Sequence, residues 1–162
     1  MPIIRHAKES DLPQILAIYN DIILHTTAVY DYRPHTIEMR REWFEGKRIG
    51  NFPVFVAEDH DRIMGFSSIG PFRAWAAYKY TVENSIYVAA HSRGKGLGKL
   101  LLRPLIIEAK AKELHAMIAS IDATNEPSLR LHKSFLFIMK PSRWSRSKHL
   151  CAQSHLTLTR SK

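Results

Sequence analysis

The sequence predicts a mixed α/β fold in a single domain spanning residues 1–162. Runs rich in β-branched and aromatic residues, which predict strands, alternate with runs whose apolar residues recur at helical spacing. Their order along the chain is β-α-α-β-β-β-α-β-α, which is typical of helices packed on a sheet. A length of 162 residues suits one domain, and no Gly/Ser-rich linker or internal repeat divides the chain.

The first part of the chain predicts one strand followed by two helices. Residues 3–4 begin a short apolar strand, and the Ser-Asp pair at 10–11 is the expected cap of a helix with apolar residues at helical spacing over 12–23. The loop HTTAVYDYRPH at 25–35 is long and aromatic, which is unusual for a simple connector. A second helix is predicted over 36–47.

The rest of the chain alternates strands and helices. Two strands separated by DHDR predict a hairpin, and Pro104 inside the next long helical run predicts a kink or a late helix start, because proline costs about 3 kcal/mol in a helix interior. The predicted elements are strands at 52–58, 63–69, 81–88, 116–121 and 151–159, and helices at 97–113 and 125–135.

Composition restricts the class of protein. Apolar residues make up 45% and charged residues 24%, and no apolar run has the roughly 18 residues that a bilayer span requires. The N-terminus lacks a signal-peptide core, and the single Cys151 cannot form an internal disulfide, so we expect a cytoplasmic protein without a membrane partner.

The net charge of +9 is concentrated at the end of the chain. Residues 1–126 contain 16 Lys/Arg and all 15 Asp/Glu, whereas residues 127–162 contain eight basic residues and no acidic one. A basic tail raises nucleic acid as a partner. Its charges are scattered, and Trp144 is the only aromatic residue after Phe137. This gives little of the base stacking by which proteins bind single-stranded nucleic acid. We therefore expect no nucleic-acid partner, although a non-catalytic binding module stays an alternative.

The stretch HSRGKGLGKLLL (91–102) predicts an anion site. Backbone N–H groups at a helix start have no intrahelical acceptors and lie at the positive end of the helix dipole. The glycines remove side chains that would block an approaching phosphate. A P-loop is excluded because Leu100 follows Lys99, and a dinucleotide fingerprint is excluded because Leu101 stands at the third glycine position.

The pattern that fits is Arg-x-x-Gly-x-Gly, from Arg93 to Gly98. It resembles the acetyl-CoA pyrophosphate loop of the GCN5-related N-acetyltransferases. The segments FRAWAAYKYTVENSIYV, IDATNEPSLRLH, AKESDLPQILAIYN and TAVYDYRP are similar to one branch of that superfamily, which acetylates phosphinothricin and methionine sulfone or sulfoximine. The resemblance covers roughly residues 2–135.

This resemblance implies a GNAT fold, in which a single mixed, mostly antiparallel sheet is flanked by helices and parts near the strand before the glycine loop. It implies acetyl-CoA as cofactor, and the acetyl transfer needs no metal. The strand before the loop would offer backbone groups to the pantetheine arm, although its side chains also fit a core role. The implied cofactor-binding residues are Ile86, Tyr87, Val88, Arg93, Gly94, Lys95, Gly96, Leu97, Gly98, Lys99, Asn125 and Ser134.

Two residues carry the chemistry that the resemblance implies. Glu83 would accept a proton from the incoming amine, directly or through water, and the alternative is a carboxylate on a solvent face. His132 stands where many relatives have a tyrosine that protonates the leaving thiolate, and the alternative is a structural histidine. Asn125 could also serve simply as a helix cap.

The implied acceptor is the α-amine of a small amino-acid analogue. Arg73, Tyr78 and Thr81, together with Glu83, suit a substrate with a carboxylate and a tetrahedral oxyanion. Trp75 would line that pocket or pack between the subunits of a homodimer. A protein N-terminus, a lysine or a polyamine is the alternative acceptor, but a polyamine site should be acidic.

The resemblance ends at residue 136. Segment 136–162 has Leu136 where a Gly-Phe pair is expected, and it lacks the Gly- and Trp-Asp-bearing strand of the family. Leu156 and Leu158 would share one face of the predicted last strand.

Overall fold

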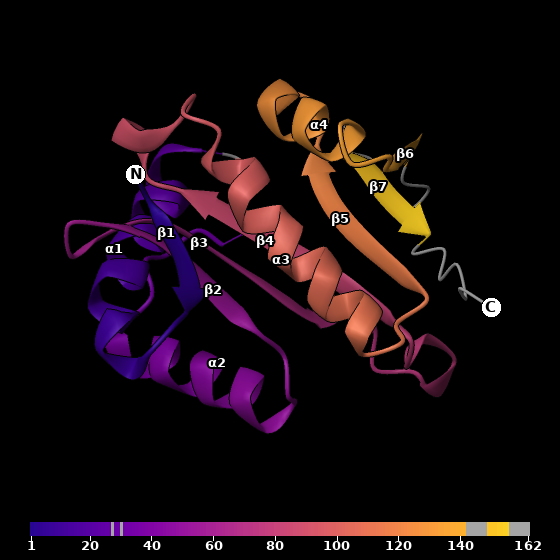
Figure 1. Ribbon diagram of the computed structural model, residues 1–162, viewed down its shortest axis with the longest axis horizontal. Coiled ribbons are helices and arrows are strands. Elements are labelled where there is room, and N and C mark those ends of the chain that lie inside the picture. The colour runs from indigo at the N-terminus through magenta and orange to yellow at the C-terminus, as the bar shows by residue number, and fades with distance from the viewer. Residues whose placement is uncertain (27, 30, 142–148, 156–162) are drawn as a thin grey trace. The chain divides into compact units, whose positions relative to one another are not determined.

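The computed structural model describes residues 1–26, 28–29, 31–141 and 149–155. The chain forms two compact units, and each is described by itself below. The first comprises Met1–Ile69 and Ser85–Leu105, and the second comprises Gly70–Asn84 and Ile106–Lys162. The hydrogen-bonded strand order is β1-β2-β3-β4-β5-β7-β6 (Figure 1). Every neighbouring pair with a described register is antiparallel except β4 and β5, as a mixed, mostly antiparallel sheet requires.

The first unit follows the predicted β-α-α-β-β order. Strands β1, β2 and β3 pair in sequence, and the predicted hairpin is confirmed because His60 and Asp61 turn the chain with φ values of 48° and 60°. The elements are β1 (Ile3–His6), a 3-10 turn (Glu9–Asp11), α1 (Leu12–His25), α2 (Ile37–Ile49), β2 (Val54–Asp59), most of β3 (Arg62–Pro71), the end of β4 (Thr81–Val88), a 3-10 turn (Ala90–Ser92) and the start of α3 (Leu97–Ala111).

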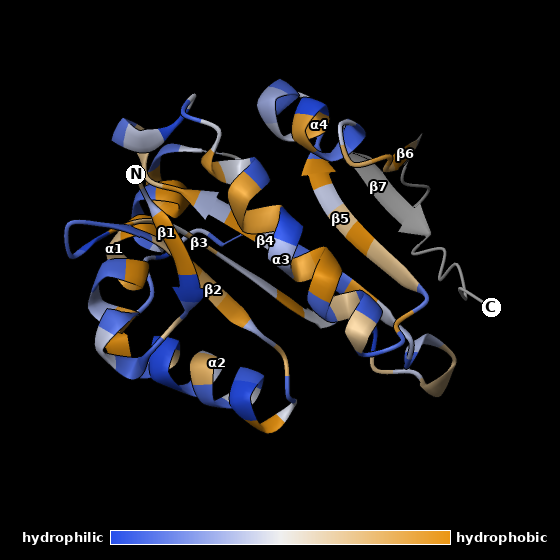
Figure 2. Ribbon diagram, in the orientation of Figure 1, coloured by the Kyte–Doolittle hydropathy of each residue, from blue (hydrophilic) through white to orange (hydrophobic). Residues whose placement is uncertain are grey.

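The core of the first unit lies between β1–β3 and the two helices α1 and α2. Phe66 of β3 is fully buried among the apolar residues of α1 and rings from α2, including Trp43. Figure 2 shows α2 largely in blue, because only part of this helix contributes apolar residues. On the opposite face of β3, Ser67 donates a 3.0 Å hydrogen bond to the carbonyl of Leu101, so the start of α3 packs there.

The predicted cap of α1 takes a different form. Thr36 caps α2 by accepting from the Met39 N–H, but Asp11 makes no side-chain cap bond to α1. Its carboxylate instead accepts from both Nη atoms of Arg5, at 2.7 and 2.9 Å, and from the Lys8 N–H at 2.7 Å. These hydrogen bonds, led by those from Arg5, lower the pKa of Asp11 although its burial opposes the shift.

Asp11→Asn is expected to lower the free energy of unfolding at pH 7 by about 2 kcal/mol, because hydrogen bonds between charged groups are lost. The folded pKa of Asp11 lies below its unfolded value, so this stabilisation is present above about pH 4 and is lost as the pH falls through the folded pKa. Urea unfolding at pH 7 and pH 3 measures both effects. Glu9→Gln, an exposed carboxylate on the same turn, is the control, and an equal loss there contradicts the assignment.

The second unit consists of β4, β5 and the C-terminal elements. β4 and β5 (Ala116–Asp122) pair in parallel, and β5 then pairs along its whole length with β7 (His149–His155), which also pairs with β6 (Ile138–Pro141). Helix α4 (Glu126–Lys133) packs on β5. The unit also contains a 3-10 turn (Ala76–Tyr78), the tip of β3 and the end of α3.

Two predictions for α3 and β7 need correction. α3 begins at Leu97 and continues through Pro104, so the late start expected from proline is wrong. The last strand begins at His149 rather than at 151, and β6 was not predicted. Leu156 and Leu158 lie outside the described residues.

Leu136 adopts a left-handed backbone conformation, which glycine adopts more readily than other residues. Its φ is 64°, its side chain is 87% exposed, and the next N–H, from Phe137, bonds back to the carbonyl of His132 at 3.1 Å. This is the usual C-terminal end of a helix, at which a left-handed residue closes the last turn. The glycine expected from the family would adopt this conformation without strain, whereas leucine adopts it at an energetic cost.

Leu136→Gly is expected to stabilise the protein by about 1 kcal/mol, because an L-residue with a side chain pays roughly that cost in the left-handed region. Urea unfolding measures the change. Leu136→Ala keeps the Cβ and should give no such gain, so equal effects of the two substitutions would show that the gain is not conformational.

Candidate active site

The glycine loop of the first unit has the geometry of an anion site. Gly94 and Gly96 have φ values of 77° and 78°, which other residues rarely adopt. A Cβ at either position would meet no heavy atom within 4 Å, so both glycines border open space. Lys99 N–H turns back to the Gly96 carbonyl at 3.0 Å, whereas the N–H groups of residues 94–98 have no acceptor among the described residues. These N–H groups can therefore donate hydrogen bonds to an anion.

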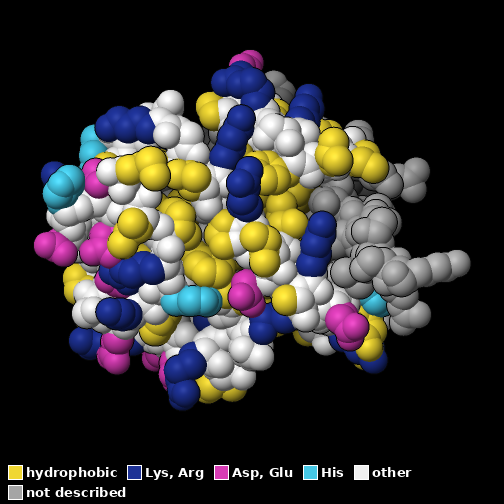
Figure 3. Space-filling model, viewed as in Figure 1, with side chains coloured by type: hydrophobic (Ala, Val, Ile, Leu, Met, Phe, Trp, Pro, Cys, Tyr) yellow, Lys and Arg dark blue, Asp and Glu magenta, His cyan; other side chains and the backbone are white. Residues whose placement is uncertain are grey.

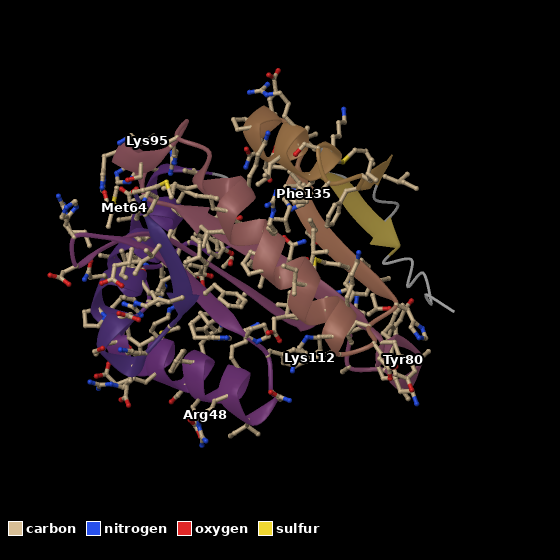
Figure 4. All side chains as sticks on the ribbon, viewed as in Figure 1. Arg48, Met64, Tyr80, Lys95, Lys112 and Phe135 are labelled. Atoms are coloured by element: carbon tan, nitrogen blue, oxygen red, sulfur yellow. The ribbon has the colours of Figure 1, made fainter. Side chains whose placement is uncertain are left out.

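Basic side chains and a buried serine support this loop. Lys95 and Lys99 are exposed, and Figure 3 shows Lys and Arg side chains gathered near the start of α3. Arg93 donates through Nε to the Val88 carbonyl at 3.3 Å. Ser92 is fully buried and its hydroxyl contacts the Met64 sulfur at 3.6 Å; Figure 4 labels Met64 and Lys95 in this region. The loop is thus anchored at its start and open at its glycines.

The end of β4 packs its Tyr87 ring against other aromatic rings. The Tyr87 ring lies 5.3 Å from the Tyr19 ring and 5.0 Å from the Phe66 ring. A Cβ on Gly65 would come within 2.7 Å of the Tyr87 carbonyl, so only glycine allows β3 to approach β4 this closely. Ile86 and Val88, the other predicted cofactor residues here, are half-buried.

The aromatic loop before α2 is held by a short chain of polar contacts. Asn20 bonds both the N–H and the carbonyl of His35, at 2.8 and 3.0 Å. His35 contacts Asp31 at 2.6 Å through Nε2 and Arg40 at 3.1 Å through Nδ1. The Arg40 guanidinium is buried 3.9 Å from the Tyr19 ring centre. Thr27 and the tyrosine at position 30 lie outside the described residues.

In the second unit, Glu83 lies where the pairing of β4 with β5 ends. The register joins Thr81 to Ala116, Val82 to Met117 and, last, Glu83 to Ile118. The half-buried Glu83 carboxylate accepts a hydrogen bond from the hydroxyl of Ser120, two residues farther along β5. The carboxylate is therefore oriented by a neighbour and still reaches solvent, as a proton acceptor requires.

The predicted substrate residues lie in the loop that Phe72 and Thr81 close by a backbone hydrogen bond of 3.2 Å. The Arg73 guanidinium lies 4.6 Å from the centre of the Phe72 ring and forms no ion pair with a described carboxylate. Tyr78 contacts both Phe72 and Trp75 by its ring, and Trp75 is 70% exposed. The loop brings Arg73 and Tyr78 against Phe72 and Trp75 against Tyr78, and it leaves the guanidinium available to an anion.

Three predicted residues lie on or beside α4. Asn125 caps the helix by accepting from the Ser128 N–H at 3.2 Å, which confirms its capping role. Ser134 donates to the Leu131 carbonyl at 2.6 Å. His132 is only 3% exposed; its Nδ1 lies 2.8 Å from the Ser128 carbonyl and its Nε2 lies 3.1 Å from Asn84 Oδ1. Burial lowers the pKa of His132, and the Ser128 carbonyl opposes that effect.

Sequence reasoning missed Asn84 and Ser120. Asn84 is 6% exposed and shares a face of β4 with Val82, so an amide in an apolar alternation was the available signal. Ser120 carried no such signal, because an exposed serine in a strand has no special pattern. Its role follows from the β4–β5 register alone.

The described residues contain no cluster of His, Cys, Asp and Glu that could hold a metal ion. Among the described helices, none combines the length and the hydropathy needed to cross a bilayer.

Comparisons with known proteins place these features in one family. The model of the acetyltransferase (GNAT) family matches residues 15–137. An L-methionine sulfoximine/L-methionine sulfone acetyltransferase from Pseudomonas paraeruginosa is 42% identical over 135 residues, which are 83% of this chain and 78% of the relative. The matched region contains both the glycine loop and Glu83.

Solved structures agree with this match. An N-acetyltransferase from Staphylococcus aureus Mu50 has a TM-score of 0.91 at 45% identity, covering 96% of this chain and 99% of that one. A GNAT superfamily phosphinothricin acetyltransferase from Sinorhizobium meliloti, in complex with acetyl-CoA, has a TM-score of 0.89 at 28% identity, covering 95% and 88%. The predicted fold is confirmed, and the chain belongs to the acetyltransferase (GNAT) family.

Proposed function

We propose that this enzyme transfers the acetyl group of acetyl-CoA to the α-amine of a small amino-acid analogue such as phosphinothricin or methionine sulfone or sulfoximine. Acetyltransferases of this family use acetyl-CoA as donor, and the Pseudomonas and Sinorhizobium relatives are named for methionine sulfoximine or sulfone and for phosphinothricin, respectively. The observation that carries the proposal is the glycine loop, in which two left-handed glycines border open space at the start of α3.

The glycine loop would bind the pyrophosphate of acetyl-CoA. The N–H groups of residues 94–98 would donate to its oxygens, with Arg93, Lys95 and Lys99 adding positive charge. Ile86, Tyr87 and Val88 would supply backbone groups to the pantetheine arm, since their side chains face the protein or are half-buried. Asn125 and Ser134, which flank α4 at its two ends, are the remaining proposed cofactor-binding residues.

The transfer is a direct displacement. The neutral amine attacks the thioester carbonyl, a C–N bond forms, and the C–S bond breaks as the thiolate leaves. Glu83 accepts the proton that the amine loses, directly or through water, and the thiolate takes one proton, for which His132 and water are the two candidate sources. The hydrogen bond from Ser120 holds the Glu83 carboxylate in place for this step.

The acceptor site would lie at the loop of residues 72–81. Arg73 has no carboxylate partner among the described residues, and its guanidinium can hold a carboxylate or phosphinate oxygen pair. Tyr78 and Thr81 would add hydrogen bonds, and Trp75 would wall the pocket or pack in a homodimer. A cationic loop disfavours a polyamine, which needs an acidic site.

A homodimer and a cytoplasmic location belong to the same proposal. The 70% exposed Trp75 ring is a large apolar group that a partner subunit would cover. The cytoplasm supplies acetyl-CoA and keeps the single Cys151 reduced.

The test is turnover on a panel of amines. Purified protein is mixed with acetyl-CoA and either phosphinothricin, methionine sulfone, methionine sulfoximine, a lysine peptide or spermidine, and free-thiol release is followed. The proposal expects the three amino-acid analogues to be acetylated most efficiently, as judged by kcat/KM. Preferred turnover of spermidine or the peptide contradicts the substrate class, and absence of acetyl-CoA binding by calorimetry contradicts the function.

A further inference from the structure

Asn84 of β4 and His132 of α4 form a buried polar pair in the second unit. Asn84 is 6% exposed and His132 is 3% exposed. Asn84 Nδ2 donates to the carbonyl of Ile118 at 3.0 Å, which turns Oδ1 toward His132 Nε2 at 3.1 Å. A buried amide with both ends engaged has one orientation, so it joins β4, β5 and α4 at a single point.

Both ring nitrogens of His132 already have partners inside the protein, so neither is available to a substrate. His132 Nε2 faces the Asn84 oxygen, and Nδ1 faces the Ser128 carbonyl at 2.8 Å and the Ser128 hydroxyl at 3.5 Å. The Phe137 ring covers the imidazole at a centroid distance of 5.0 Å. Burial lowers the pKa of His132 and favours the neutral ring, so its one N–H already has an interior acceptor. Proton donation to a thiolate would break a buried hydrogen bond.

The Asn84–His132 pair lies where it can fix the position of Glu83 on β4. The backbone pairing of β4 with β5 ends at Glu83 and Ile118, and the next side chain, Asn84, bonds the carbonyl of that same Ile118. Glu83 points to the other face of β4, where Ser120 of β5 orients its carboxylate. Successive residues of one strand therefore tie β5 from both faces, and a shift of Asn84 would move Glu83 relative to Ser120.

We propose that Asn84 is a positioning residue for the acetyl transfer and that His132 is its buried partner, so that water rather than His132 protonates the leaving thiolate. The proposal rests on the proposed function, in which Glu83 accepts the amine proton. Of these three residues, Glu83 touches the reacting groups, whereas Asn84 and His132 hold its strand in place.

The kinetic test compares a proton-donor role with a positioning role. His132→Gln places an amide N–H near the position of Nε2 but cannot act as an acid; it should keep kcat within about threefold of wild type, with an overlaying pH profile of kcat. Asn84→Leu and His132→Leu should each lower kcat about tenfold or more, because the carboxylate loses its alignment, while the Kd for acetyl-CoA stays close to wild type. Lys133→Leu, the exposed neighbour of His132, is the matched control.

The double variant Asn84→Leu/His132→Leu measures the coupling of the pair. Each single variant leaves a buried polar group without its partner and should lower the melting temperature, whereas the double variant should melt no lower than the worse single variant. Melting temperatures that fall additively overturn the pairing. A His132→Gln enzyme that loses kcat as fully as His132→Leu, with an altered pH profile, overturns the positioning role.

The two proposals fail in different ways. Wild-type protein that neither binds acetyl-CoA nor releases thiol with any amine of the panel refutes the proposed function, and with it the positioning role. The melting temperatures still decide whether Asn84 and His132 act as a pair, because that readout needs no substrate. Turnover by wild type and by His132→Gln, with loss in Asn84→Leu, supports both proposals together.

Discussion

Glu83→Gln is expected to lower kcat by roughly 10²- to 10⁴-fold, the range typical of a lost general base. The amide can still accept the Ser120 hydrogen bond that orients the carboxylate, so the side chain keeps its place and loses only its capacity to accept a proton. The Kd for acetyl-CoA, measured by calorimetry, should remain close to the wild-type value because the glycine loop is unchanged.

The control for this substitution is Glu45→Gln, which removes an exposed carboxylate paired with Arg48 on α2. It should leave kcat unchanged, since exposed ion pairs contribute little. Raising the pH should partly rescue Glu83→Gln, because a larger fraction of the amine is then neutral without help. Full activity of Glu83→Gln at neutral pH would assign the proton acceptor to another group.

Gly96→Val is expected to raise the Kd for acetyl-CoA about 100-fold. Gly96 has a φ of 78° and borders open space, so a β-branched side chain would disfavour the loop conformation and fill the volume that the pyrophosphate should occupy. Because the new Cβ meets no protein atom within 4 Å, the folded protein has room for it. Calorimetry with acetyl-CoA, and thermal unfolding of the free protein, separate the two effects.

Gly46→Ala provides the matched control. Gly46 lies in the interior of α2, its added Cβ also meets nothing within 4 Å, and alanine favours a helix by about 1 kcal/mol over glycine. The substitution should raise the melting temperature and leave the Kd unchanged. An unchanged Kd in Gly96→Val would show that the glycine loop does not hold the cofactor.

The local elements were predictable because their signals are local. The helix of residues 12–23, the hairpin at DHDR and the strand at 81–88 follow from apolar spacing and turn residues that act within a few positions. The glycine loop was predictable for the same reason, since its register excludes two other phosphate loops and its glycines have the positive φ values that only glycine adopts readily.

Other features depend on side-chain contacts and packing, which the spacing of apolar residues does not reveal. Asp11 looked like a helix cap but serves Arg5, because β1 brings that guanidinium against the turn. Pro104 looked like a helix boundary, but the packed α3 continues through it. The Arg5–Asp11 ion pair in the first place, and helix packing in the second, outweighed the local preference.

The sequence by itself determined the order of elements through α4 and predicted the anion-binding loop, since both follow from residue type and neighbours, and its resemblance to the family pointed to Glu83 as the candidate base. Only the tertiary structure decided that Glu83 stands where β4–β5 pairing ends, that Ser120 orients it, and that His132 is buried against Asn84. The physical reason is that hydrogen-bond partners and burial arise when β4, β5 and α4, separated by some 30 to 50 positions, come into contact.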